Sequence, residues 1–191
     1  MARDVVVGLG NEGSAYRHTR HNLGAYFVEY CVDPSLPEKF LWPQVDERLA
    51  CRWTWAECGG QSTCFVRPMG FMNESGIGLQ RWLSFFKKSA EELILCCDDI
   101  TIPLGGLKIS FRPGTAGHRG VESVGRHIGP GFGRFRLGIG PKRHPEMDLK
   151  DHVLGRFSEE EQACVEAHLP LWRRELELLL DKGGNPPMKI S

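Results

Sequence analysis

One short polar segment near the start of the chain carries groups that could perform acid–base chemistry. Within twelve residues the sequence brings together five such side chains: Asn11, Tyr16, Arg20, His21 and Asn22. Imidazole titrates near neutral pH, so His21 is the candidate for a general base. A carboxylate on its other ring nitrogen would fix the tautomer and stabilise the protonated ring. Asp98 is the expected partner because it follows the buried run 92–97, whereas side-chain alternation directs Asp99 away.

The elements that must position these groups follow from the hydrophobic periodicity. Apolar runs and alternating segments predict strands at 5–7, 49–57, 62–67, 92–97, 107–112 and 135–139. Helical spacing predicts helices from 23 to 30, from 73 to 86, from 121 to 128, and from 158 to 180 with a kink at Pro170. Residues 34–47 are expected to form a loop. This alternation predicts an α/β fold with a twisted mixed sheet flanked by helices on both faces, and ligands bind such sheets beyond the carboxyl ends of the strands.

Length and composition indicate a single domain. The 191 residues are predicted to form one unit, 1–191, with a flexible tail at 183–191. No apolar run has the length of a membrane span, and the run after Asp4 is too short for a signal peptide, so we expect a cytoplasmic protein. The seven cysteines contain no C-x-x-C pair, which predicts reduced, mostly buried thiols. Cys58 and Cys64 could be imagined as zinc ligands, but no second pair completes a tetrahedral site.

Charge is unevenly distributed although 24 basic and 24 acidic residues cancel overall. Between residues 108 and 143 eight basic residues stand against one acid, a net charge of +7. Between residues 146 and 181 ten acids stand against four bases, a net charge of −6. Glycines and phenylalanines interleave the basic stretch, which favours a nucleic acid as the partner. An ordinary solvated face is the alternative.

The segment 8–13 reads GLGNEG and matches the dinucleotide-binding pattern G-x-G-x-x-G after a strand. In that fold the helix begins within the motif, yet the residues that follow here lack an apolar stripe. The acid that would bind the ribose is also missing, because Glu29 lies inside a helical pattern and Asp33 precedes a proline. A nicotinamide cofactor is therefore not expected.

Several blocks of sequence carry a resemblance to a known family. They are GLGNEGSAYRHTRHNLG at 8–24, RPMGFMNESG at 67–76, DDITIPLG at 98–105, GHRG at 117–120 and RFRLGIG at 134–140. In this order they resemble the signatures of bacterial-type peptidyl-tRNA hydrolases, and HVLGRF at 152–157 extends the likeness over most of the chain.

The resemblance implies a substrate, a pocket and a set of roles. The expected substrate is peptidyl-tRNA, with no cofactor, no metal, no obligate protein partner and a monomeric protein. The implied catalytic residues are His21, Asp98, Asn11 and Asn73. The implied substrate-binding residues are Tyr16 and Met72 near the peptide, and His118 and Arg119 in the fourth block. In the basic stretch, Lys108, Arg136 and Lys142 are the candidate phosphate contacts, and an ordinary surface cation is the alternative for each. Asn73 has a simpler alternative as the N-cap of the following helix.

Hydrolysis of an ester requires an activated water, a base for its proton and donors for the oxyanion. The amides of Asn11 and Asn73 could donate to a carbonyl or orient a water without adding charge. No serine stands in a G-x-S-x-G turn, so direct attack by water is the simpler mechanism. Cys97 is an alternative nucleophile, but it ends a buried run.

Two positions depart from the family pattern. Glu12 replaces the usual proline, and Arg119 replaces an asparagine of the substrate-binding set. A guanidinium is bulkier than an amide and can only donate hydrogen bonds. Arg119 could grip the end of the tRNA, or it could mark a relative that binds RNA without hydrolysing it. The joint presence of a base and its carboxylate favours the enzyme.

Overall fold

A seven-stranded mixed sheet forms the centre of the molecule in a computed structural model, which describes residues 3–35, 40–112 and 114–182. The strands are β1 (Val5–Gly8), β2 (Gln44–Asp46), β3 (Cys51–Cys58), β4 (Gln61–Pro68), β5 (Leu93–Asp99), β6 (Leu107–Ser110) and β7 (Gly133–Gly138). Their order across the sheet is β2-β3-β4-β1-β5-β7-β6. The four central strands β4, β1, β5 and β7 run parallel, and the outer strands pair antiparallel.

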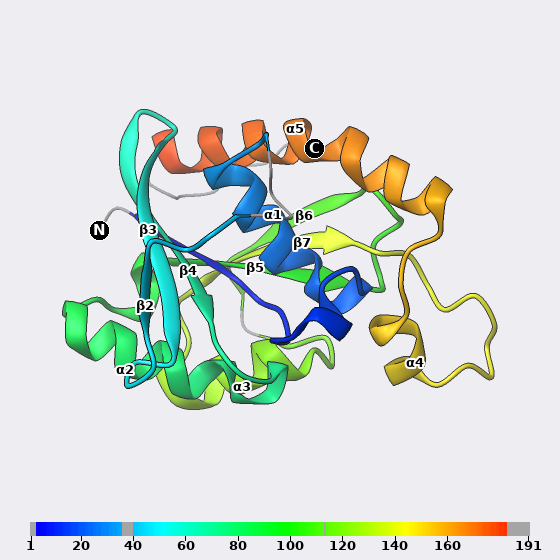
Figure 1. Cartoon of the computed structure of the whole chain (residues 1–191), viewed down its shortest axis with the longest axis horizontal. Helices are drawn as coiled ribbons and strands as arrows, with labels where there is room; N and C mark the ends of the chain where they lie inside the picture. The colour runs from blue at the N-terminus through cyan, green and yellow to red at the C-terminus, as the bar shows by residue number, and fades with distance from the viewer. Residues whose placement is uncertain (1–2, 36–39, 113, 183–191) are drawn as a thin grey trace.

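Helices cover both faces of this sheet, as the sequence predicts. They are α1 (Leu23–Val32), α2 (Ser75–Phe86), α3 (Arg119–Ile128), α4 (Leu149–Leu154) and α5 (Glu159–Asp181). In Figure 1, α5 and α1 lie on the opposite side of the sheet from α2 and α3. The alternation of side chains along β1 explains the two layers, because Val6 packs with α1 and α5 while Val5 and Val7 pack with α2.

Two glycines allow backbones to approach closely beside the sheet. A Cβ atom on Gly24 would lie 2.3 Å from the carbonyl oxygen of Cys96, so only glycine lets the start of α1 rest on β5. A Cβ atom on Gly120 would lie 2.4 Å from the sulfur of Met72, so glycine leaves room for this side chain against the start of α3. Both contacts draw chain segments toward one edge of the sheet.

The elements differ from the sequence predictions in two places. The expected loop at 34–47 contains strand β2, which pairs with β3 at the edge of the sheet. Helix α4 was not predicted, because six residues are too few to establish a helical period. The helix predicted from 158 to 180 is confirmed as α5, one element of 23 residues that contains Pro170. The predicted tail at 183–191 lies outside the described residues.

The cysteines are free thiols, and six of the seven are buried. Burial raises the pKa of the Cys97 thiol, and the neighbouring carboxylates of Asp98 and Asp99 raise it further. A protonated, buried thiol is a poor nucleophile, which argues against the alternative role for Cys97. Among the described residues no helix is both long and apolar enough to cross a membrane.

Candidate active site

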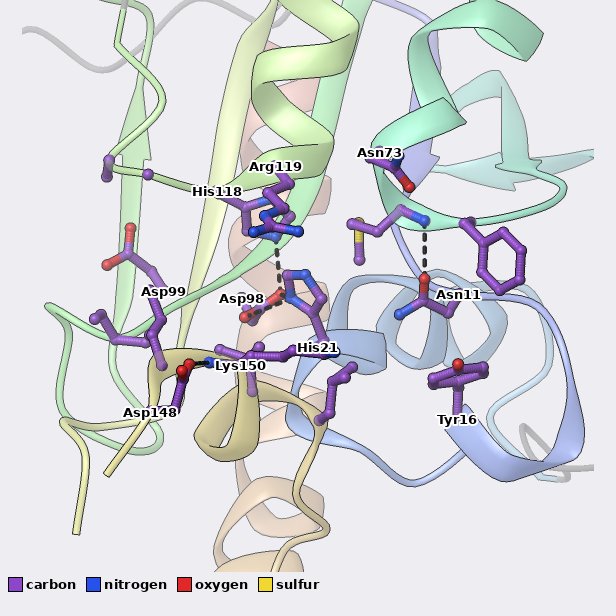
Figure 2. Close-up of a pocket in the computed structure, with 18 residues that line it drawn as sticks. Asn11, Tyr16, His21, Asn73, Asp98, Asp99, His118, Arg119, Asp148 and Lys150 are labelled. Atoms are coloured by element: carbon purple, nitrogen blue, oxygen red, sulfur yellow. Dashed lines mark hydrogen bonds and ion pairs between the residues drawn. The ribbon is translucent and has the colours of Figure 1, made fainter. Parts of the chain in front are cut away.

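A cavity of about 280 Å³ opens beyond the carboxyl ends of β1, β4 and β5. Its lining includes all four predicted catalytic residues: Asn11, His21, Asn73 and Asp98. Figure 2 shows these side chains around the cavity, with the start of α3 on one side and α4 on another. Segments far apart in the sequence therefore meet at this edge, as the rule for parallel strands predicts.

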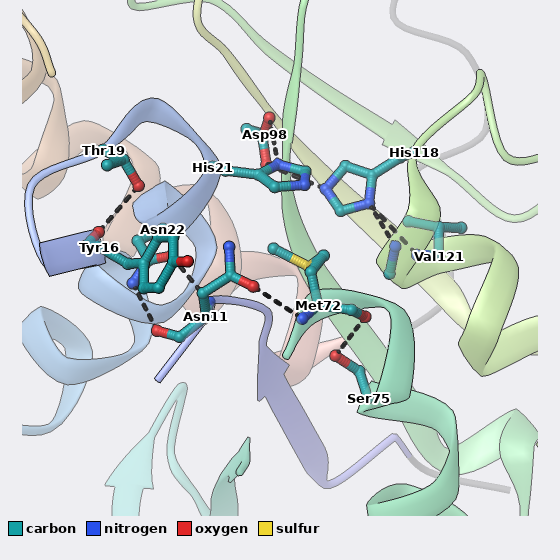
Figure 3. A network of polar contacts seen from close by, with 11 residues as sticks. Asn11, Tyr16, Thr19, His21, Asn22, Met72, Ser75, Asp98, His118 and Val121 are labelled. Atoms are coloured by element: carbon teal, nitrogen blue, oxygen red, sulfur yellow. Dashed lines mark hydrogen bonds and ion pairs between the residues drawn. The ribbon is translucent and has the colours of Figure 1, made fainter. Parts of the chain in front are cut away.

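The segment that carries His21 is held rigidly by its own polar groups (Figure 3). The side chain of Asn22 accepts from the backbone N–H of Asn11 at 2.8 Å and donates to its carbonyl at 2.9 Å. The hydroxyl of Thr19 donates to the carbonyl of Tyr16 at 2.8 Å. Arg20 is buried and donates to the carbonyl of Arg156 beyond α4. The segment between β1 and α1 thus forms two 3-10 turns instead of the helix that a dinucleotide site requires.

Asp98 accepts hydrogen bonds from two imidazoles. His21 Nδ1 lies 2.9 Å from Asp98 Oδ1, and His118 Nε2 lies 2.9 Å from the same oxygen. Burial alone would raise the pKa of Asp98, but the two imidazoles and their hydrogen bonds outweigh it and hold the pKa well below its usual range. The carboxylate therefore remains ionised, and His21 must present a proton on Nδ1 to it.

The tautomer of His118 follows from its other contacts. Its Nδ1 accepts from the backbone N–H groups of Gly120 at 3.1 Å and Val121 at 3.3 Å, which makes His118 the N-cap of α3. A nitrogen that accepts from two N–H groups carries no proton, so the ring is neutral with its proton on Nε2. His118 therefore donates to Asp98. The prediction had placed His118 among the substrate-binding residues, and in the structure it lines the cavity while bonded to Asp98.

The same tautomer bears on metal binding. Within the described part of the chain, His21, Asp98 and His118 are the one group of side chains close enough to share an ion. Because Nδ1 of His118 accepts two backbone hydrogen bonds, its Nε2 keeps the proton and has no lone pair for a metal. These donors do not fit a metal ion without rearrangement of α3.

Asn11 is oriented by the loop that follows β4. Its Oδ1 accepts from the backbone N–H of Met72 at 2.8 Å, so its amide nitrogen faces the cavity (Figure 2). Asn11 therefore offers N–H donors to a ligand. Asn73 is exposed and also lines the cavity. Its alternative role as an N-cap is wrong, because the cap positions at this end of α2 are Phe71 and Glu74.

An aromatic wall closes one side of the cavity. Tyr16 and Phe71 meet edge to face with ring centroids 6.5 Å apart, and Phe71 is 55% exposed. Met72 lies buried beside them. The sequence singled out Tyr16 and Met72 but gave no separate role to Phe71. The available signal was its position next to Met72 in the block 67–76.

The opposite wall comes from α3 and α4. Arg119 lines the cavity from the first residue of α3, together with Ala116 and Gly117. Helix α4 contributes Lys150 and the apolar side chains Leu149, Val153 and Leu154. These α4 residues were missed because the helix itself was missed.

The predicted phosphate contacts differ in how they are engaged. Lys108 is exposed on the edge strand β6. Arg136 forms an ion pair with Asp99 at 2.6 Å, and its side chain is only 13% exposed. Lys142 donates to the carbonyls of Pro145 at 2.7 Å and Met147 at 3.0 Å. Of these three side chains, only Lys108 is exposed to solvent and has no partner among the described residues.

Known proteins of similar sequence and structure give one consistent result. The family model described as peptidyl-tRNA hydrolase matches residues 5–190. A peptidyl-tRNA hydrolase of Thermotoga petrophila is 34% identical over 190 residues, covering 97% of this chain and 95% of that protein. One of Aquifex aeolicus is 37% identical over 162 residues, covering 84% and 81%. A crystal structure of peptidyl-tRNA hydrolase from Acinetobacter baumannii has a TM-score of 0.81 at 30% identity, covering 94% of this chain and 89% of that chain. The resemblance carried by the sequence blocks is confirmed.

Proposed function

Because this chain belongs to the peptidyl-tRNA hydrolase family, we propose that it cleaves the ester between the peptide and the 3'-terminal ribose of tRNA with a water activated by His21. As a member of this family it is a hydrolase. The observation that carries the mechanism is the contact of His21 Nδ1 with the buried carboxylate of Asp98 at 2.9 Å beside the cavity.

The contact with Asp98 determines which nitrogen of His21 can act. With the proton on Nδ1, the lone pair lies on Nε2, which makes no hydrogen bond among the described residues. This nitrogen can accept a proton from a water in the cavity. The positive charge that then forms on the ring is stabilised by Asp98, which stays ionised.

The proposed reaction has two proton transfers. Water gives a proton to His21 Nε2 as its oxygen bonds to the ester carbon, and the carbonyl oxygen becomes an oxyanion. The carbon–oxygen bond to the ribose then breaks, and the protonated His21 returns its proton to the leaving ribose oxygen. The products are a tRNA with its terminal hydroxyl restored and a free peptide acid, which releases the second proton of the water to solvent and becomes a carboxylate.

Two amides are positioned to stabilise charge on the ester. The amide nitrogen of Asn11 faces the cavity because its oxygen is bonded to Met72 N. It can donate to the carbonyl oxygen as that oxygen becomes negative. We assign Asn73 to the same group of donors, since it lines the cavity next to Met72. The wall of Tyr16, Phe71 and Met72 would hold the peptide.

The tRNA is proposed to approach over β6, where Lys108 is exposed. We further propose a monomer that acts in the cytoplasm without an obligate protein partner. The reduced cysteines and the peptidyl-tRNA substrate, which is made during translation, support that location.

Release of peptide from an N-blocked aminoacyl-tRNA by the purified protein tests this function under single-turnover conditions. The wild type should release peptide, and His21→Ala should lose roughly 10²- to 10⁴-fold in rate while its affinity for the substrate is largely kept. Comparable turnover by His21→Ala would remove His21 as the base.

The second candidate function is RNA binding without hydrolysis, which is motivated by Arg119 at a position where the family resemblance implies an asparagine. A protein of that kind would bind the same substrate tightly and leave the ester intact. The single-turnover experiment therefore separates the two functions directly.

A further inference from the structure

Two cations on different walls of the cavity have no carboxylate partner in the described part of the chain. Arg119 is the first residue of α3, and Lys150 lies in the first turn of α4. Both line the cavity, and neither takes part in an ion pair of the described residues. Figure 2 shows them on either side of the pair formed by His21 and Asp98.

The carboxylates that line the same cavity are already engaged by other groups. Asp98 accepts from His21 and His118. Asp99 pairs with Arg136 at 2.6 Å and accepts from the hydroxyl of Thr101. Asp148 accepts from the backbone N–H of Lys150 at 2.7 Å as the N-cap of α4. Each acid therefore has its own donors, and the two side-chain cations remain available to an anion from outside.

The chemistry of the substrate limits what that anion can be. The peptide has no free terminal carboxylate, because that group forms the ester. On the tRNA side the nearest charge is the phosphodiester that joins the last two nucleotides. It is attached to the same ribose as the ester, so a cation in the cavity of His21 can reach it. An acidic side chain on the last amino acid is the other candidate, but only some peptides carry one.

We propose that Arg119 and Lys150 determine specificity by binding the phosphodiester between the last two nucleotides of the tRNA. This inference rests on the proposed function. A guanidinium and an ammonium on two walls of the cavity would hold one phosphate from two sides, with N–H donors from both. The phosphate would fix the terminal ribose, and hence the ester carbon, relative to His21 Nε2. Peptidyl-tRNA would then be preferred over esters that lack this phosphate.

The test uses N-blocked aminoacyl-tRNA in which a neutral methylphosphonate replaces one phosphodiester. It is placed either between the last two nucleotides or at a linkage several nucleotides away. For the wild type we expect kcat/KM to fall roughly 10-fold with the terminal replacement and to change little with the distant one. For Arg119→Gln or Lys150→Gln the terminal replacement should lower kcat/KM much less, because one cation that would bind the phosphate charge is already absent.

The matched control is Arg126→Gln. Arg126 lies on the same helix α3 but pairs with Glu122 on the surface, so this variant loses one charge away from the cavity. It should keep the full sensitivity to the terminal replacement. If Arg119→Gln and Lys150→Gln keep it as well, the cations do not bind this phosphate and the proposal is overturned. A loss confined to substrates with an acidic last residue would also overturn it and would assign the cations to the peptide.

The affinity of His21→Ala variants for the normal and the methylphosphonate substrates tests this inference separately from the proposed function. The substrate stays intact there, so the effect of the methylphosphonate on binding is read without turnover. If the wild type fails to hydrolyse normal substrate but the binding pattern appears, the function is wrong and the phosphate site stands. If the wild type hydrolyses normal substrate but the terminal methylphosphonate does not weaken binding, the proposed function stands and the phosphate site is wrong.

Discussion

At the scale of single residues, the carboxylate of Asp98 links two histidines with different duties. It accepts one hydrogen bond from each, from His21 Nδ1 and from His118 Nε2. Among the described residues, only His21 of these two keeps a ring nitrogen without a hydrogen bond, because Nδ1 of His118 is bonded to the backbone of α3. Of the two imidazoles, His21 is thus the one suited to accept a proton, and His118 is suited to position Asp98.

Substitution of His118 tests that division. His118→Asn keeps an oxygen that can cap α3 but loses the donor to Asp98, and His118→Ala loses both. We expect kcat to fall about 10-fold in each variant, since a hydrogen bond to a charged group is worth ~1.5–3 kcal/mol at most sites and His21 still holds Asp98. The free energy of unfolding of His118→Ala should also be about 1 kcal/mol lower than that of His118→Asn, because asparagine is a good N-cap. Full kcat in His118→Asn would mean that His118 acts only as a cap.

At the scale of elements, Glu12 ties together the two loops that carry the cavity amides. Its backbone N–H donates to the carbonyl of Gly70 at 2.9 Å, and its carboxylate accepts from the N–H of Gly70 at 3.1 Å. Arg52 on β3 donates to the same carboxylate. Burial raises the pKa of Glu12, but Gly70 and Arg52 outweigh it and the pKa is lowered. A proline at this position would lack the first of these bonds.

The substitution Glu12→Gln tests whether this tie positions Asn11. The amide loses the ion pair with Arg52, so we expect the free energy of unfolding to fall by about 1 kcal/mol and kcat/KM to fall several-fold. Arg52→Met should have a similar effect, and the double variant should be little worse than either single one. Additive losses measured by urea unfolding and initial rates would show that the two side chains act independently.

Helix α4 should respond to pH through His152. This histidine is buried, and its Nε2 donates to the carbonyl of Gly140 at 3.1 Å. Burial lowers its pKa, and nearby Arg20 lowers it further, against the raising effect of the Gly140 carbonyl. Above the ordinary value of 6.5 both folded and unfolded states are neutral and the stability is complete.

Below that pH the unfolded chain binds the proton first, so stability declines until the folded histidine also titrates. We expect the unfolding free energy of the wild type to fall as the pH is lowered from 7.5 to 5.5. Its slope should be steeper than that of His152→Gln by up to about 1.4 kcal/mol per pH unit. Urea unfolding at several pH values measures this, with His144→Gln as the control because His144 is exposed. Equal slopes in the wild type and His152→Gln would contradict it.

At the scale of the whole molecule, ion pairs reduce the number of cations that the basic stretch 108–143 can offer to a partner. Of the eight bases between 108 and 143, three pair with carboxylates: Arg126 with Glu122, Arg136 with Asp99, and Arg143 with Glu161, which Arg20 shares. Arg134 is buried and donates to backbone carbonyls. The basic stretch therefore offers fewer free cations to RNA than its net charge suggests.

Lys108 is the sharper test of tRNA contact than Arg136. Charge reversal at Arg136 would break its pair with Asp99 beside the cavity and mix two effects. For Lys108→Ala we expect weaker tRNA binding, a slope of log affinity against log salt that is smaller by about 1, and an unchanged kcat at saturation. Arg126→Ala serves as the matched control. An unchanged salt slope in Lys108→Ala would remove this contact.

The sequence by itself determined the α/β class, most of the strands, and the choice of His21 and Asp98 as the candidate base and its partner. These follow from local patterns: apolar runs that must be buried, polar groups directly after them, and the rule that carboxyl ends of parallel strands share one edge. The family blocks added the assignment of Asn11 and Asn73 to the pocket, and the substrate. None of this required knowledge of how the helices pack.

Only the tertiary structure decided the bond from His118 to Asp98, the tie made by Glu12, the wall formed by α4, and which cations are already paired. Hydrogen bonds between residues distant in the sequence, such as His118 with Asp98 or Glu12 with Gly70, depend on strand register and on how closely helices approach the sheet. Those are set by packing, for example by Gly24 against Cys96. A one-dimensional pattern records which groups exist, but their partners are chosen in three dimensions.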